Sequence, residues 1–419
     1  MAPEKKTNDG YEWTPKSVSV SKGLESDAVV QPPRRLESTP NRLYDTIVIG
    51  AGYAGHAAAR DLSTKGHSVL LLEARDRIGG RTYTVKKDGA KPRRTTHEEA
   101  GAMTSRAWDL FVNVDGQHCR TICPLPHAQL NNIVVDRSTI QKWDQMSCQD
   151  RYVQIKDQLS AEQRGLLVSL LLHISGGDME NSSFWDMARS HALMTHDSKN
   201  FGDIWLRYKL RQGQTALAKR MFGEAVDYGL EYIFSFPVSS IIQRSDGIQV
   251  RGISGQTFRA RKVVCTIPLN VLKDVQFILP LSTTRREAIE LGHVNQMSKI
   301  HVDVSNTELE GWNGMRFPGT LMYGYGDGVL PNDVNDAQIF HNWCTDPYSK
   351  GGPAWWRPGY MSKYQDELQS RHGDIFFASG DWAHGWRASI DGALEQGIMN
   401  AQTIATELRP KGRLGQSRL

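Results

Sequence analysis

Three glycines stand at the spacing that lets a backbone approach phosphate groups. Gly50, Gly52 and Gly55 follow residues 45–49, which end in three apolar residues, in the order G-x-G-x-x-G, with Ala54 inside the motif. The first glycine permits a tight turn, the second lets a pyrophosphate come close to the main chain, and the third allows a helix to pack closely on a strand. A helix that begins here presents free N–H groups and the positive end of its dipole to phosphates. The spacing therefore predicts phosphate binding.

The segments around these glycines predict a complete β-α-β unit. Residues 45–49 have the composition of a buried strand, residues 57–63 that of a helix, and residues 68–72 that of a second buried strand. The second strand ends at Glu73, about 20 residues beyond the glycines, where a carboxylate can accept hydrogen bonds from ribose hydroxyls. The unit predicts a Rossmann-like dinucleotide-binding domain.

Two further segments narrow the choice of dinucleotide. Residues 73–81 read E-A-R-D-R-I-G-G-R, a tail that nicotinamide-type Rossmann units do not need. Residues 375–397 read as an apolar strand, a Gly-Asp pair, an aromatic-rich turn and I-D-G-A-L-E-Q-G at the start of a helix. Together with the glycine turn, these segments resemble the flavin-containing amine oxidase family, which includes monoamine oxidases and L-amino acid oxidases, in a soluble fungal-type form. The resemblance implies that the dinucleotide is FAD.

The resemblance also implies roles for individual residues. Arg81 is expected along the diphosphate and flavin, Asp381 at the ribityl chain, and the backbone near Ile390 at the flavin N1/O2 edge, where negative charge develops on reduction. Residues 98–104 resemble the family's flavin-contacting loop, and Val238 stands where a backbone contact to adenine is expected. The expected cofactor contacts are Gly50, Gly52, Ala54, Gly55, Glu73, Ala74, Arg75, Gly79, Gly80, Arg81, Gly101, Ala102, Met103, Val238, Gly380, Asp381, Ser389 and Ile390.

Lys299 is the candidate catalytic residue, at the head of an alternating strand. The resemblance implies that it holds a water that bridges to flavin N5, and burial beside the flavin would disfavour its charge. A lysine that faces solvent on an edge strand is the alternative. Trp355, Trp356 and Trp386 are expected as walls of the substrate pocket, because aromatic faces orient an amine and exclude water. Packing in the core or in a lid is their alternative role.

Three departures from the family pattern bear on chemistry. Residues 351–354 read Gly-Gly-Pro-Ala where covalent monoamine oxidases have Gly-Gly-Cys-Tyr, so we expect FAD to bind noncovalently. Ser389 stands where the second aromatic of the usual cage belongs. Thr104 occupies the position of the carboxylate-binding arginine of L-amino acid oxidases, although Arg106 is close by. The identity of the substrate therefore stays open among arylalkyl amines, cyclic amines and modified amino acids.

The resemblance implies an FAD-dependent amine oxidase. Hydride would pass from the carbon alpha to the amine to flavin N5, and O2 would reoxidise the flavin to give H2O2 and an imine that can hydrolyse to an aldehyde or ketone. An L-amino acid oxidase, or a flavin-dependent desaturase or cyclisation enzyme of the same fold, is the alternative. Outside enzymes, the alternative is an FAD-bound interaction protein.

Composition restricts the partners. The formal net charge of +4 is small for 419 residues, so we expect no nucleic-acid partner, only a small-molecule amine and O2. The five cysteines have neither zinc-site nor disulfide spacing, so we expect no metal. No apolar run suits a membrane anchor, and a homodimer is left open. Residues 417–419, Ser-Arg-Leu, resemble a peroxisomal address, which favours a peroxisomal location, with the cytoplasm as the alternative.

The expected fold class is α/β, a Rossmann-like FAD-binding domain interleaved with an α+β substrate-binding domain. Residues 1–41 are polar and predict a flexible N-terminal arm, and residues 411–419 a C-terminal tail. The FAD-binding domain is expected from residues 42–105, 235–298 and 370–410, and the substrate domain from residues 106–234 and 299–369.

Overall fold

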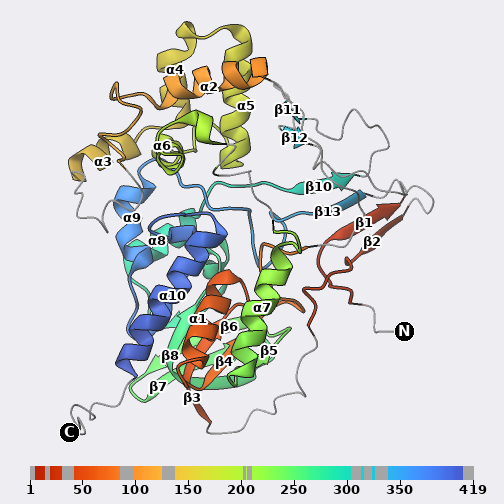
Figure 1. The fold of residues 1–419 in the computed structure, drawn as a ribbon. Helices are drawn as coiled ribbons and strands as arrows, with labels where there is room; N and C mark the ends of the chain where they lie inside the picture. Colours follow the sequence, from red (N-terminus) through yellow and green to blue (C-terminus); the bar gives the residue numbers. More distant parts are fainter. Residues whose placement is uncertain are drawn as a thin grey trace, which may run out of the picture.

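The computed structural model describes most of the chain (Figure 1). The described residues are 5–14, 19–30, 42–84, 98–124, 137–201, 204, 210–302, 313–315, 323–325 and 338–408. Within this part of the chain, no helix is both long and apolar enough to cross a bilayer. The Ser-Arg-Leu end lies outside the described residues, as do the side chains of Gly101, Ala102 and Met103.

The larger sheet is the predicted Rossmann-like unit with an antiparallel extension. Its strand order is β5-β4-β3-β8-β7-β6-β9, and β14 pairs with β8. Strands β5, β4, β3, β8 and β14 run parallel, as crossover connections through helices require. The strands are β3 (Leu43–Ile49), β4 (Val69–Leu72), β5 (Glu231–Ile233), β6 (Val238–Arg244), β7 (Gly247–Gly252), β8 (Thr257–Cys265), β9 (Gln276–Ile278) and β14 (Ile375–Phe377).

Helices cover both faces of this sheet, because neighbouring residues of β3 point to opposite sides. Val48 packs in one core cluster with α1, α7 and α10, whereas Ile47 and Ile49 pack in another with α8 and α9. Figure 1 shows α10, α1 and α7 side by side over one face. These helices are α1 (Tyr53–Ser63), α7 (Gln214–Asp227), α8 (Thr283–Leu291), α9 (Tyr360–Gln369) and α10 (Ile390–Glu407).

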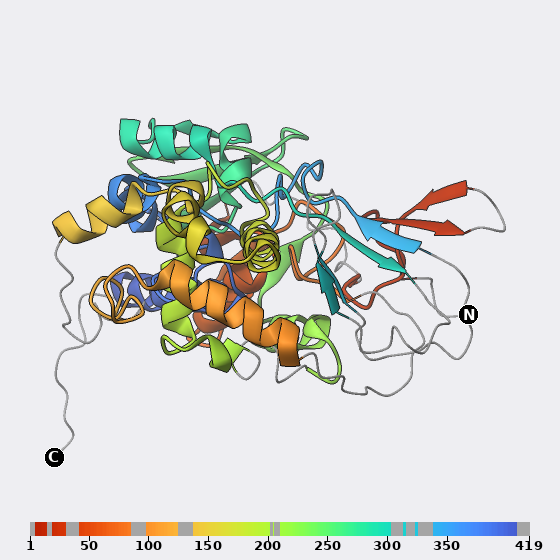
Figure 2. The same ribbon diagram turned by 90° about the horizontal axis from the view of Figure 1, so that it is seen from above.

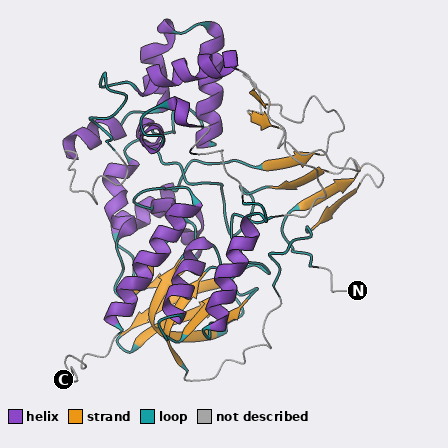
Figure 3. Ribbon diagram, viewed as in Figure 1, coloured by secondary structure: helices purple, strands orange, loops and turns teal. Residues whose placement is uncertain are grey.

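A separate group of helices forms a third core above the sheet domain (Figure 3). Helix α5 begins at a Ser160–Gln163 capping box and ends at Gly176 in the left-handed conformation. The helices are α2 (Glu98–Val112), α3 (Arg137–Asp144), α4 (Cys148–Ile155), α5 (Ala161–Ser175) and α6 (Phe184–Leu193). Short 3₁₀ helices are η2 (Lys156–Gln158), η3 (Ser198–Asn200), η5 (Leu269–Asp274) and η7 (Gly380–Trp382).

The N-terminal segment differs from the predicted flexible arm where it is described. It forms β1 (Tyr11–Thr14) and β2 (Ser19–Lys22), which extend a four-stranded antiparallel sheet in the order β10-β13-β1-β2. Figures 1 and 2 place these four strands together at one edge of the molecule. Backbone pairing and ion pairs order a segment whose composition is polar. The partner strands are β10 (Lys299–Val302) and β13 (Gln338–His341), and β11 (Asn313–Met315) pairs with β12 (Tyr323–Tyr325).

The packing also differs from the expected boundary at residue 235. Helix α7 shares the core cluster of α1, and β5 pairs with β4, so residues 214–234 pack with the dinucleotide-binding sheet. The arrangement of helices and sheets is the predicted α/β class.

Candidate active site

The glycine turn has the geometry of a phosphate cradle. Gly50 has φ +105°, and a Cβ there would collide with Thr266. A Cβ on Gly55 would collide with the Gly50 carbonyl, because α1 packs directly on the turn. Gly52 caps α1 without a side-chain hydrogen bond, so the first N–H groups of the helix are open to a ligand.

Glu73 is held against this turn by backbone donors. Its Oε2 accepts a hydrogen bond from the Ala51 N–H at 2.5 Å, and its Oε1 accepts one from the Arg75 N–H at 2.8 Å. Burial raises the pKa of the Glu73 carboxyl, while these two hydrogen bonds and the charge of Arg75 oppose the rise. Each oxygen keeps a further lone pair, so the carboxylate can still accept ribose hydroxyls.

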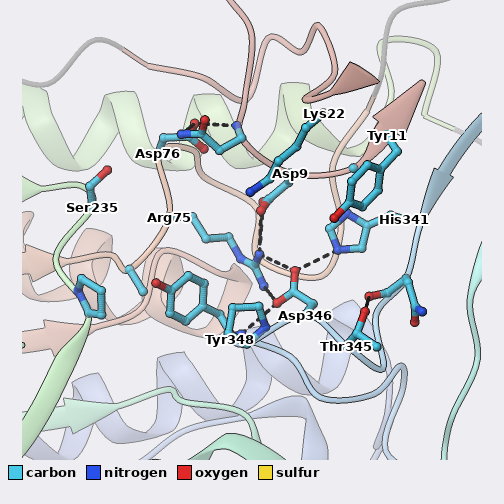
Figure 4. A pocket seen from close by; sticks show the side chains of 16 residues that line it. Asp9, Tyr11, Lys22, Arg75, Asp76, Ser235, His341, Thr345, Asp346 and Tyr348 are labelled. Atoms are coloured by element: carbon cyan, nitrogen blue, oxygen red, sulfur yellow. Dashed lines mark hydrogen bonds and ion pairs between the residues drawn. The ribbon is translucent and has the colours of Figure 1, made fainter. Parts of the chain in front are cut away.

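Arg75 is a buried ion-pair centre (Figure 4). Its guanidinium donates to Asp346 at 2.7 and 2.8 Å, to Ser349 at 2.9 Å and to Asp9 at 3.1 Å. Burial alone would lower the pKa of Arg75, but the hydrogen bonds and charge of Asp346 raise it. The Arg75 side chain is therefore committed to protein carboxylates, and it fixes the loop while other groups face the cofactor.

Beside Arg75 lies a cavity of about 410 Å³. Figure 4 shows His341 and Asp9 on the two sides of the Arg75–Asp346 pair. His341 Nε2 lies 2.9 Å from an oxygen of Asp346. Burial raises the pKa of the Asp346 carboxyl, but the hydrogen bonds from His341 and Arg75 lower it by more, so the net shift is downward. The cavity is lined by Asn8, Asp9, Gly10, Tyr11, Lys22, Ala74, Arg75, Asp76, Ser235, Pro237, His341, Asn342, Thr345, Asp346, Pro347 and Tyr348.

Arg81 joins three motifs that are far apart in the sequence. It donates to Asp381 at 2.5 Å and to the Gly352 carbonyl at 2.9 Å. Asp381 is buried and also accepts the Leu269 N–H at 2.9 Å. Burial would raise the pKa of Asp381, but Arg81 and His293 lower it, so the carboxylate is ionised. The structure thus places the second signature, residues 351–354 and the closing motif in one site.

The closing motif presents the start of a helix, as the sequence predicts. Ser389 caps α10 by accepting the Gly392 N–H at 3.1 Å, and Ile390 is the first helical residue. Ala388 has φ +68°, and its N–H donates to the Gly380 carbonyl at 2.8 Å, which folds the turn back on the strand end. The positive end of the α10 dipole therefore lies beside the Arg81–Asp381 pair.

The adenine side is less regular than the glycine turn. Val238 is half-buried at the start of β6, and the register of β6 against β7 shifts between Val238 and Ser240. Such an irregularity frees backbone groups from the ladder, which suits the expected backbone contact to adenine. Residues 98–104 differ from expectation, because they begin helix α2 instead of forming a loop.

The substrate-side residues have different surroundings from those expected. Trp356 is 1% exposed, its ring centroid lies 3.6 Å from the Arg387 guanidinium carbon, and its backbone N–H donates to Asp186 at 2.7 Å. Trp356 is therefore packed in the core, which is the alternative that the sequence left open for these tryptophans. Trp355 and Trp386 are half-buried and stay candidates for walls of the substrate pocket.

Lys299 is exposed at the head of β10, opposite His341 in the register, whereas a buried lysine was expected. Its position on the predicted strand is confirmed, and its link to flavin N5 stays a prediction.

Sequence reasoning missed two anchors of the site. Arg387 stands in the closing motif and forms a buried ion pair with Asp186, which could have been suspected from its place among apolar neighbours. Asp9 lies in the polar N-terminal segment and ion-pairs with Arg75 and Arg77, and no local pattern marks it.

A cluster of Asp109, His118 and His191 lies away from this site, with ligand-type atoms within 4.8 Å of one another. Burial lowers the pKa of His191 to about 4, so its ring is neutral near pH 7. The Trp108 indole N–H donates to His191 Nδ1 at 3.1 Å, which leaves the proton of the neutral ring on Nε2. Because Trp108 occupies Nδ1, a metal would have to displace the proton on Nε2 to bind His191.

The residues present fit FAD. A glycine turn with an open helix end, a buried carboxylate and a second helix start beside an arginine match a pyrophosphate, a ribose and an isoalloxazine edge, respectively.

Comparison with family models gives an independent result. The model described as flavin containing amine oxidoreductase matches residues 91–313 and 325–405, and that described as NAD(P)-binding Rossmann-like domain matches residues 48–111.

Similar curated proteins cover most of the chain. Pseudooxynicotine dehydrogenase of Pseudomonas sp is 29% identical over 88% of this chain and 87% of that protein. (S)-6-hydroxynicotine oxidase of Paenarthrobacter nicotinovorans is 26% identical over 84% of this chain and 97% of that protein. The flavin-containing amine oxidase B of Sus scrofa is 22% identical over 86% of each chain.

Solved structures share the fold. Wild-type putrescine oxidase bound to putrescine has a TM-score of 0.69 at 17% identity, covering 87% of this chain and 99% of that one. Cyclohexylamine oxidase from Brevibacterium oxydans IH-35A has a TM-score of 0.63 at 17% identity, covering 88% and 100%.

Proposed function

Since this chain belongs to the flavin-containing amine oxidase family, we propose that it oxidises a small amine and passes the electrons to O2, giving H2O2 and an imine. Its cofactor is FAD, and it is a flavin-dependent amine oxidoreductase. The single observation that carries the proposal is Arg81, which connects three family motifs through Asp381 and the Gly352 carbonyl.

The chain's own residues bind and orient the cofactor. FAD, when bound, supplies the acceptor for the two electrons and the hydrogen of the amine's α-carbon. Glu73 accepts the ribose hydroxyls, and the open start of α1 binds the pyrophosphate. The start of α10 and Arg81 place positive potential at the flavin edge, which stabilises the charge that develops there.

On the substrate side, Trp355 and Trp386 shape the pocket and exclude water. An indole is neither an acid nor a base near neutral pH, so these walls leave the proton of the amine unchanged, and an amine that binds unprotonated needs no general base. Lys299 holds a water near the reacting atoms and acts in the reaction with O2.

The relatives favour an alkyl amine that also carries an aromatic ring. Pseudooxynicotine dehydrogenase and (S)-6-hydroxynicotine oxidase are named after nicotine derivatives, which carry an alkyl amine and a pyridine ring. One of these is a dehydrogenase and the other an oxidase, so the electron acceptor needs its own test. We propose aryl-substituted cyclic or secondary amines as the substrate class, with O2 as the acceptor.

FAD is bound without a covalent link in this proposal, since Pro353 and Ala354 stand where covalent relatives have Cys and Tyr. Denaturation of the purified protein in acid should release all of the yellow flavin into solution. Flavin that stays with the precipitated protein would contradict this part.

The decisive experiment is anaerobic reduction of the purified yellow protein. Aryl cyclic amines, arylalkyl amines, aliphatic diamines and L-amino acids are mixed with it, and the flavin absorbance is followed. We expect bleaching by an aryl cyclic amine, then rapid recovery and stoichiometric H2O2 when O2 is added. Bleaching by amino acids alone would indicate an L-amino acid oxidase, no bleaching by any compound would favour an FAD-bound interaction protein, and recovery with an artificial acceptor alone would indicate a dehydrogenase.

The peroxisomal address at residues 417–419 and a homodimer stay predictions. A fluorescent protein fused ahead of the chain, with and without the last three residues, tests the first, and sedimentation of the purified holoprotein tests the second.

A further inference from the structure

The N-terminal strap, defined as residues 5–14 and 19–30, lies against the loop that carries the second FAD signature. Hydrogen bonds and ion pairs between residues far apart in the sequence hold the strap to this loop. Thr7 contacts Asp76, which lies 69 positions later, and Asp9 contacts Arg77, which lies 68 positions later. The loop residues contacted are Arg75, Asp76, Arg77, Ile78 and Thr84.

Asp9 is the centre of this contact. Its carboxylate lies 3.1 Å from Arg75 Nη1 and 2.7 Å from Arg77 Nε. Arg75 has Asp346 as a second carboxylate partner. For Arg77, which is 0% exposed, Asp9 is the one carboxylate within ion-pair distance among the described residues. Loss of Asp9 would therefore leave a buried cation without a counterion.

Arg77 transmits this contact to the glycine pair. Its Nη1 donates to the Gly80 carbonyl at 2.8 Å and to the Ile78 carbonyl at 3.1 Å. Gly80 has φ +60°, and a Cβ there would lie 3.2 Å from the Cα of Gly52 in the glycine turn. The chain of contacts from Asp9 through Arg77 to Gly80 thus fixes the second signature against the first.

Both ends of the loop are attached as well. Thr7 Oγ1 and the Asn8 N–H each donate to Asp76 at 2.7 Å, near the start of the loop. At the other end, Ser26 Oγ donates to the Thr84 carbonyl at 2.6 Å. In between, the Ala28 carbonyl accepts the Ile78 N–H at 3.0 Å, and Ala28 is buried in the core cluster of α1.

We propose that the N-terminal strap is a clamp on the FAD site, and that Asp9 is a positioning residue that holds Arg77 and Gly80 at the cofactor. The strap belongs to the substrate-side sheet through β1 and β13, so it ties that sheet to the cofactor loop. The proposal rests on FAD binding and is independent of which amine is oxidised, so failure of the substrate assignment would leave it unaffected.

The test measures how tightly the holoprotein keeps its flavin. Asp9→Asn removes the charge with little change in shape, and Glu12→Gln, on β1 of the same strap, is the matched control. We expect Asp9→Asn to release FAD roughly tenfold faster than the wild-type protein, as measured by the fluorescence of free flavin. The release rate of Glu12→Gln should stay within about twofold of the wild-type rate. Equal release from Asp9→Asn and Glu12→Gln would overturn the proposal.

A second readout separates positioning from general support of the fold. The unfolding temperature is measured with and without FAD, because a ligand stabilises the native state according to its affinity. We expect the FAD-dependent increase to shrink in Asp9→Asn and to be partly restored in Asp9→Glu. An undiminished FAD-dependent increase would assign Asp9 a purely structural role and contradict the proposal.

If Asp9→Asn does not fold, the isosteric Thr7→Val removes the hydrogen bond from Thr7 Oγ1 to Asp76 and the one that this oxygen accepts from the Asp9 N–H. We then expect about threefold faster release of FAD. Release at the wild-type rate, or flavin that stays with the acid-denatured protein, would show that the cofactor is held by other means and would overturn the proposal.

Discussion

Arg75 and Lys299 are cations on the two sides of the same candidate site, and their surroundings are opposite. Arg75 is 5% exposed and donates to Asp346, Ser349 and Asp9, whereas Lys299 is exposed on a strand whose four residues all face solvent. The cofactor side is thus organised by contacts within the protein before any ligand binds. On the substrate side Lys299 is exposed and Trp355 and Trp386 are half-buried, so these residues gain their roles from what binds there. Substitutions on the two sides should therefore separate stability from chemistry.

The largest effect is expected from Arg75→Ala. The substitution leaves Asp346 buried without its main cation, so we expect the free energy of unfolding to fall by about 5 kcal/mol and FAD to be lost. Urea unfolding and flavin content measure this. Arg259→Ala removes an exposed ion pair with Asp246 and should change stability by less than about 1 kcal/mol. Similar losses in both variants would contradict the comparison.

The tryptophan doublet gives the next effect. Trp356→Ala empties a core position under Arg387 and should cost about 4 kcal/mol of unfolding free energy. Trp355→Ala, at the half-buried neighbour, should cost about 1 kcal/mol. We expect a change in the KM for the amine from Trp355→Ala. A change in KM confined to Trp356→Ala, measured in variants that retain FAD, would reverse the two roles.

His56 gives the cofactor side a pH dependence. It is fully buried in α1, and burial lowers its pKa to about 4 from an ordinary 6.5. As the pH falls from 6.5 to 4, the unfolded chain binds a proton that the folded protein does not, so stability is full above 6.5 and falls by about 3 kcal/mol by pH 4. His56→Leu should remove this contribution to the loss of unfolding free energy at acid pH, which urea unfolding between pH 7 and 4 measures. An unchanged slope in the variant would show that His56 is not its source.

The smallest effect on stability is expected from Lys299→Met, which should change the free energy of unfolding by less than about 0.5 kcal/mol because the side chain is exposed. Reoxidation of reduced flavin by O2 should slow by about tenfold, with anaerobic reduction unchanged. Stopped-flow absorbance separates the two steps, and Lys273→Met is the exposed control. If reoxidation matches the control, Lys299 has no part in the reaction with O2.

The residues that sequence could predict are those whose partners are close in the chain. The glycine turn and Glu73 belong to one β-α-β unit, so spacing alone places them together. The Arg81–Asp381 contact spans 300 residues, and only the resemblance to a family indicated it. Trp355 and Trp356 are neighbours outside any helix or strand, so no periodicity in the sequence could tell which one enters the core.

Asp9 could not be predicted, because the polar residues around it have the composition of a solvated arm. Its segment is ordered by ion pairs to Arg75 and Arg77 and by pairing of β1 with β13, none of which leaves a local pattern. A segment that is stabilised by burial of apolar residues shows a periodic pattern in its sequence, whereas a segment that is stabilised by long-range ion pairs does not.

Strand β14 and helix α10, the last elements in the described part of the chain, complete the FAD-binding domain. β14 pairs with β8, and α10 packs so closely on α1 that a Cβ on Gly397 would collide with the Ala54 carbonyl. While the chain is being synthesised, the apolar side of α1 must wait uncovered until residues 390–407 have left the ribosome. The surface on which the start of α10 meets the glycine turn is therefore complete only after α10 has been synthesised.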